Sequence, residues 1–132
     1  MTSKEFREML ADFVEEFDPI LQKFEEFLKK KDLDIAREIS SLLIRLGISF
    51  QRSFKEHSHS VLTASMYEAG LRISERTNLM KIRGIRGEDI EYFEDIYNIF
   101  KHIADTIKAG EYEESFHKMA KRRSRDRRKR EQ

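Results

Sequence analysis

The chain has 132 residues, of which 39% are charged and none is cysteine. Its length corresponds to about one domain, and the absence of cysteine excludes disulfides, thiolate metal sites and a cysteine nucleophile. No apolar run approaches the roughly 18 residues of a membrane span, and the first residues alternate charged with apolar side chains. We therefore expect a cytoplasmic protein without a membrane partner.

The composition is typical of a compact helical protein, because the chain has one proline and five glycines and is rich in lysine, arginine and glutamate. Such an abundance of ion-pairing residues is also typical of thermophilic proteins, and we expect such a source. Apolar residues recur with the helical period, and no strand pattern is visible. We predict an all-α, up-and-down bundle of five or six helices in residues 1–117 and a basic helical extension or tail in residues 118–132.

The first helix is predicted to begin at a capping box formed by Thr2 and Glu5. Its apolar stripe covers residues 6–28 at intervals of three and four. Pro19 lacks an amide proton and disfavours helix at Asp18. Because the apolar phase continues beyond the proline, we expect a kink or a tight break at which Asp18 caps a second piece, without a change of direction.

The least polar stretch, residues 33–54, predicts a central helix that Asp32 or Asp34 caps. Ile44 and Ile48 lie near its opposite, arginine-bearing arc, away from the core face. These two isoleucines predict contacts with more than one neighbouring helix or with a second chain in a homodimer, although scattered exposed apolar residues are also common. The predicted core face consists of Ile35, Ile39, Leu42, Leu43, Leu46, Phe50 and Phe54.

Three further helices are predicted at residues 60–80, at residues 88–108 and from residue 111 onward. The segment KIRGIRGED, residues 81–89, contains two glycines and is expected to be a basic loop. Gly110 is placed to end the helix before it.

Charge is divided unevenly along the chain. Residues 118–132 hold nine lysines and arginines against two acidic residues, a net charge of +7, which leaves −6 for residues 1–117. This asymmetry favours a nucleic-acid partner, and an acidic protein, the chain's own acidic body or a solubilising role are the alternatives. The tail has no aromatic residue with which to stack on bases. The predicted phosphate-binding residues are Lys121, Arg122, Arg123, Arg125, Arg127, Arg128, Lys129 and Arg130, with help from Arg83 and Arg86.

The eight residues RSFKEHSH, 52–59, resemble the motif of HEPN domains, in which four to six residues stand between an arginine and a histidine. HEPN domains are small helical bundles, and many are dimeric RNases. The resemblance implies that Arg52 binds the scissile phosphate and that His57 or His59 assists proton transfer. In one unbroken helix Arg52 would lie about 20° from His59 and about 140° from His57, so His59 is the better candidate. The alternative is an ordinary histidine at a helix end.

Two Glu-x-x-His spacings, Glu56 with His59 and Glu114 with His117, match those of di-iron bundles. Helical phase places both glutamates away from the apolar faces, so we expect neither a metal nor another cofactor. The leading hypothesis is a non-enzymatic protein that binds nucleic acid through its tail and self-associates through its bundle. An endoribonuclease similar to HEPN domains and a helical adaptor or assembly subunit that docks on an acidic protein are the alternatives.

Overall fold

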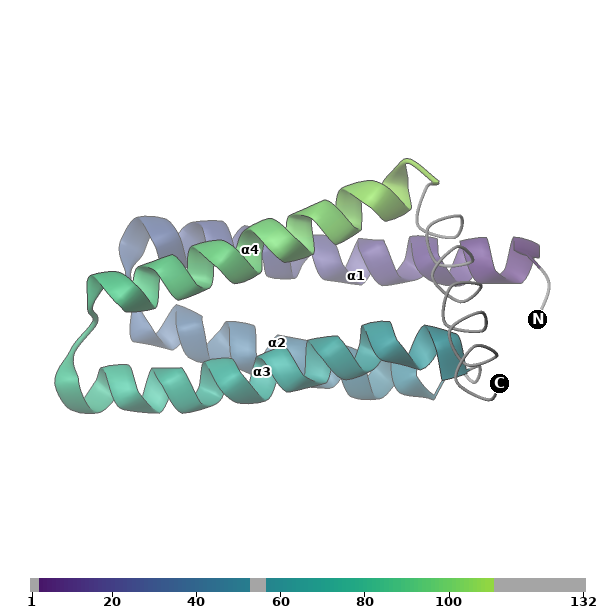
Figure 1. Ribbon diagram of the computed structural model, residues 1–132. Helices are drawn as coiled ribbons and strands as arrows, with labels where there is room; N and C mark the ends of the chain where they lie inside the picture. Colours follow the sequence, from purple (N-terminus) through teal and green to yellow (C-terminus); the bar gives the residue numbers. More distant parts are fainter. Residues whose placement is uncertain (1–2, 53–56, 111–132) are drawn as a thin grey trace, which may run out of the picture.

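The computed structural model describes residues 3–52 and 57–110, and this part of the chain forms four α-helices and no strand (Figure 1). They are α1 (Ser3–Lys30), α2 (Leu33–Gln51), α3 (His57–Arg83) and α4 (Gly87–Lys108). The predicted all-α class is confirmed. The helix predicted from residue 111, the basic tail and the boundary at residue 118 lie outside the described residues, so the count of five or six helices stays a prediction.

The four helices alternate in direction, with α1 and α4 forming one pair and α2 and α3 the other (Figure 1). Ion pairs on the surface join neighbouring helices: Lys23 of α1 pairs with Glu38 of α2 at 2.9 Å, and Lys108 of α4 pairs with Asp18 of α1 at 3.0 Å. The pair α2 and α3 has the most extensive contact, and α1 contacts both α2 and α4. Within the described ranges, no helix is both long and apolar enough to cross a membrane.

α1 runs through Pro19 as one helix. The expectation that Asp18 caps a second piece is therefore wrong, and the Asp18 carboxylate instead accepts a hydrogen bond from Lys108. The apolar stripe explains this continuity, because Phe13 and Phe17 before the proline and Phe24 after it are all fully buried. Packing of one unbroken face offsets the lost amide hydrogen bond.

Phenylalanines of α1 form the centre of the core. Phe13 lies against Phe50 of α2, with ring centroids 5.3 Å apart and an edge-to-face angle of 89°. Phe27 lies 4.2 Å from Phe93 of α4, and Phe17 and Phe24 both contact Phe100. Burial of one such ring contributes about 1.5–3 kcal/mol, so this row joins α1 to both of its neighbours.

The ends of α2 follow from local chemistry. The Asp34 amide donates to Asp32 Oδ1 at 2.8 Å, which confirms Asp32 as the cap. The helix ends at Gln51, earlier than the predicted residue 54, with Arg52 as its C-cap. Every described residue of the predicted core face is buried or half-buried, and Phe54 lies outside the described residues. The described members are Ile35, Ile39, Leu42, Leu43, Leu46 and Phe50.

α2 and α3 approach closely because small residues line their contact. The Ser40 hydroxyl donates to the Gly70 carbonyl at 2.8 Å. A Cβ atom added at Gly70 would lie 2.7 Å from Ile44 Cγ1, so Ile44 packs directly against the α3 backbone. This contact confirms that the central helix touches more than one neighbour, whereas Ile48 remains 44% exposed.

We predict that Gly47→Ala destabilises the bundle, because the new Cβ would lie 2.9 Å from the Thr63 carbonyl oxygen and 3.0 Å from the Tyr67 amide. Overpacking against backbone costs about 1–3 kcal/mol, which exceeds the gain of about 1 kcal/mol that alanine brings to a helix. Urea unfolding measures the change. Gly87→Ala is the control, because an added Cβ meets nothing within 4 Å there. Equal stability of Gly47→Ala and the wild type would contradict the close contact.

Candidate functional site

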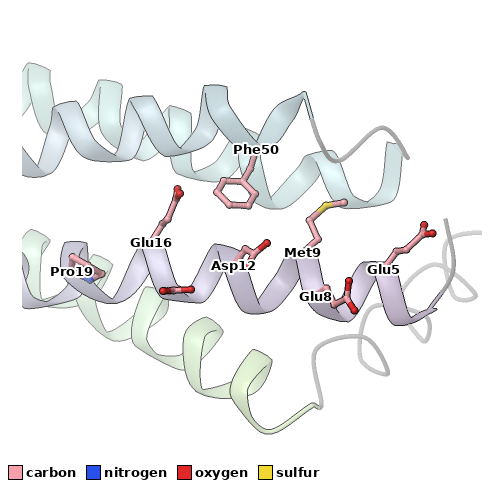
Figure 2. A pocket seen from close by; sticks show the side chains of 8 residues that line it. Glu5, Glu8, Met9, Asp12, Glu16, Pro19 and Phe50 are labelled. Atoms are coloured by element: carbon pink, nitrogen blue, oxygen red, sulfur yellow. The ribbon is translucent and has the colours of Figure 1, made fainter.

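A shallow groove with acidic walls runs along the first half of α1 and faces the end of α2 (Figure 2). Met9, Pro19 and the edge of Phe50 form its apolar floor. Its walls are carboxylates that recur along one side of the helix, namely Glu5, Glu8, Asp12, Glu15 and Glu16. The negative electrostatic potential of these carboxylates repels phosphates and attracts basic segments, so the groove is unsuited to nucleic acid.

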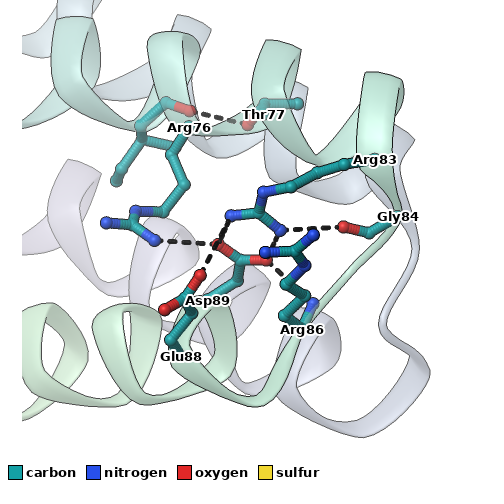
Figure 3. Close-up of polar contacts among 8 residues, drawn as sticks. Arg76, Thr77, Arg83, Gly84, Arg86, Glu88 and Asp89 are labelled. Atoms are coloured by element: carbon teal, nitrogen blue, oxygen red, sulfur yellow. Dashed lines mark hydrogen bonds and ion pairs between the residues drawn. The ribbon is translucent and has the colours of Figure 1, made fainter.

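A buried polar cluster joins the end of α3 to the start of α4 (Figure 3). Asp89 is fully buried. Arg83 donates to both of its carboxylate oxygens, at 2.8 and 2.9 Å, and Arg76 donates to Oδ1 at 2.8 Å. The backbone amide of Arg86 donates to Oδ2 at 2.8 Å, so Asp89 also caps the first turn of α4, where a negative charge is favoured by the helix dipole.

These contacts determine the charge of the cluster. The Arg83 hydrogen bonds hold the pKa of Asp89 far below its usual range, with help from Arg86 and Arg76, and they outweigh the opposing effect of burial. The Arg83 side chain is 15% exposed and that of Arg76 29% exposed. The Arg76 guanidinium also lies 4.2 Å from the centre of the Tyr92 ring. Sequence reasoning did not identify Arg76 or Asp89.

The two basic residues predicted to help the tail have different roles. Arg83 also donates to the Gly84 carbonyl at 3.0 Å and pairs with Glu88 at 3.5 Å, so both of its terminal nitrogens are occupied within the fold. Arg86 is exposed, and only its backbone takes part in the cluster. The predicted loop of residues 81–89 is limited to residues 84–86, because α3 continues to Arg83 and Gly84 adopts a φ of 86° to reverse the chain.

The HEPN-like residues do not lie on one helix. Arg52 is the exposed C-cap of α2, and His57 and His59 belong to the first turn of the antiparallel α3. The separation of about 20° between Arg52 and His59 required an unbroken helix, and that condition is not met. Arg52 and the start of α3 nevertheless occupy the same end of the α2–α3 pair (Figure 1).

The remaining sequence candidates are not placed. The predicted tail residues, Lys121 to Arg130, and the metal candidates Glu56, Glu114 and His117 lie outside the described residues. Among the residues that are described, no group of three or more histidine, aspartate or glutamate side chains is arranged to hold a metal ion.

Comparison with known proteins gives no relative: the chain matches no protein-family model, and neither a curated protein nor a solved structure is significantly similar to it.

We predict that Asp89→Asn lowers the free energy of unfolding at pH 7 by about 3 kcal/mol, because it leaves two partly buried guanidinium groups without their counter-charge. The folded-state pKa of Asp89 is depressed, so its stabilising effect is complete above the ordinary carboxyl pKa of about 4. That effect is lost as the pH falls below this value toward the lowered pKa.

Urea unfolding between pH 7 and pH 2 measures both effects. The wild type should lose stability toward acid more steeply than Asp89→Asn. Glu88→Gln is the matched control, because the Glu88 side chain is 64% exposed and contacts Arg83 only at 3.5 Å. Parallel pH profiles for wild type and Asp89→Asn would show that the buried carboxylate does not stabilise the fold.

Proposed function

We propose that the chain is a small non-enzymatic protein that binds nucleic acid electrostatically through its basic C-terminal segment and self-associates through its helical bundle. The observation that carries this proposal is the division of charge, +7 in residues 118–132 against −6 in residues 1–117. The proposed phosphate-binding residues are Lys121, Arg122, Arg123, Arg125, Arg127, Arg128, Lys129 and Arg130, with the exposed Arg86 as a helper.

The described bundle supports an assignment to the tail in two ways. The groove on α1 is acidic and repels phosphates. Arg83, which the sequence suggests as a second basic contact, is held by Asp89 inside the fold. The last described residue, Gly110, lies beside Arg7 and Leu10 of α1, the helix that also carries the acidic groove.

The expected mode of binding is neutralisation of phosphates without base recognition. Each lysine or arginine that contacts duplex DNA releases counterions and lowers the slope of log K against log salt by about 0.9. Eight such contacts make affinity strongly salt-dependent. Because the tail has no aromatic side chain, bases have nothing to stack on and sequence preference should be weak.

We predict that Arg127→Gln with Arg128→Gln weakens binding to every nucleic acid. Two lost phosphate contacts should make the salt slope shallower by about 1.8 on duplex DNA and by about 1.4 on single strands. Fluorescence anisotropy with labelled duplex DNA, single-stranded DNA and RNA measures both quantities between low and physiological salt. A chain truncated after Ala120 should bind none of the three detectably at physiological salt.

The control removes the same charge from the bundle. Lys29→Gln with Lys81→Gln changes two exposed lysines, one at the end of α1 and one near the end of α3, and should leave the salt slope unchanged. Failure of the intact chain to bind at low salt would contradict the proposal and favour a protein partner for the tail. Cleavage of RNA that Arg52→Ala or His59→Ala abolishes would favour the HEPN-like endoribonuclease.

A further inference from the structure

An apolar patch lies on the outer side of the α2–α3 pair, turned away from α1 and α4. We call Ile44, Ile48, Tyr67 and Leu71 the outer patch. Ile48, Tyr67 and Leu71 are 44, 40 and 42% exposed, and they are three of the six large apolar residues that are markedly exposed in the described part of the chain. Apolar side chains that gather on one exposed face mark contact sites on soluble proteins.

Contacts between the two helices show that the patch is continuous. Gly70 lies against Ile44, and Gly47 lies against Tyr67. Ile48 follows Gly47 and Leu71 follows Gly70, each turned about 100° further toward the outside of its helix. The four side chains of the outer patch therefore lie along one edge of the α2–α3 contact, in the order Leu71, Ile44, Tyr67 and Ile48 along the helices.

The two rims of the outer patch carry opposite charges. Arg37 and Arg45 are exposed on the α2 side, and Glu68 and Glu75 are exposed on the α3 side. Arg45 and Glu75 have no ion-pair partner among the described residues. Glu68 pairs only with Arg72 on its own helix, where both side chains are more than 60% exposed. Arg37 pairs with Asp34 of its own helix at 3.9 Å, and this pair is also exposed. The rim charges therefore remain accessible to another molecule.

The register of the antiparallel α2 and α3 determines which of these charged residues lie at the same height along the helix axes. Gly70 lies level with Ser40 and Ile44, and Thr63 lies level with Gly47. Counting along the two helices from these contacts, at about 1.5 Å per residue in opposite directions, places Glu75 level with Arg37. The same counting places Glu68 level with Arg45.

We propose that the outer patch is the interface with a second copy of this chain, in a two-fold dimer whose axis runs parallel to the helices. This inference rests on the proposed function, which includes self-association, and it identifies the surface through which two chains would associate. Such an axis lays α2 on the partner's α3 without changing the level along the helices. Arg37 then faces the partner's Glu75, Arg45 faces the partner's Glu68, and the two outer patches bury one another.

A second copy fits this surface better than nucleic acid does. The acidic rim repels phosphates, whereas a copy of the same surface brings a basic rim to it at matching levels. Each charge pair occurs twice because a two-fold interface is isologous. The apolar patch supplies the attraction, and the rims fix the orientation of the two chains.

Sedimentation equilibrium of the full-length chain, without nucleic acid, tests the interface. We expect a dimer at micromolar concentration and at least a hundredfold weaker dimer for Leu71→Glu, which places a charge within the outer patch. Ile99→Glu is the matched control, because Ile99 is 55% exposed on α4, outside the outer patch, and should leave dimerisation unchanged. Circular dichroism checks that both variants are folded.

Charge reversal tests the orientation. Arg37→Glu and Glu75→Arg should each weaken the dimer about tenfold, because two exposed pairs become repulsive. The double variant with both changes keeps the net charge of the wild type and should restore the dimer. A monomeric wild type, a Leu71→Glu dimer of wild-type strength, or a double variant as weak as the single ones would each overturn the proposal. Loss of nucleic-acid binding with an intact dimer would contradict only the proposed function of the tail.

Discussion

The bundle depends on the row of phenylalanines along α1. Phe13, Phe17, Phe24 and Phe27 are fully buried, and they contact aromatic rings from α2 on one side and from α4 on the other. α1 is therefore the helix that packs the two helix pairs against one another. The same row holds α1 as one helix across Pro19, since a break there would separate rings that must reach the core together.

Specific polar contacts fix the position of α3, which the aromatic rings of α1 do not determine. The core holds α1 against α2 and α4, whereas α3 is fixed mainly by its close contact with α2 and by Asp89 at the start of α4. A buried carboxylate is tolerated there because four hydrogen bonds from three residues satisfy it. Removal of these donors would leave a buried charge without a partner. Arg83 thus stabilises the fold. The sequence alone suggested a different role for it, because a basic loop such as residues 81–89 is typical of phosphate binding.

The sequence predicted the helices and most of the core because their signals are local and periodic. The stripe of α1, the Asp32 cap and the end of α4 just before Gly110 all follow from residues within a few turns of one another. The continuity of α1 and the Asp89 cluster could not be predicted in this way. The first depends on rings of α2 and α4, and the second brings Arg76 to a carboxylate thirteen positions away. The only local signal for that cap was an aspartate at the third position of the first turn of α4, after a loop that contains glycine. This signal does not identify the arginines that bind the aspartate.

The proposed self-association and the proposed nucleic-acid binding use different parts of the chain. The outer patch lies on α2 and α3, whereas Gly110 lies at the end of α4 beside α1. The proposed dimer would therefore leave the α1–α4 side of each chain uncovered, so the proposed interface and the proposed nucleic-acid binding would not compete. Binding by one tail raises the effective concentration of the other, so the dimer should bind long nucleic acids more tightly than its monomer without any additional contact per chain. In the proposed mode of binding, the net charge of −6 on residues 1–117 would repel the phosphate backbone from the body.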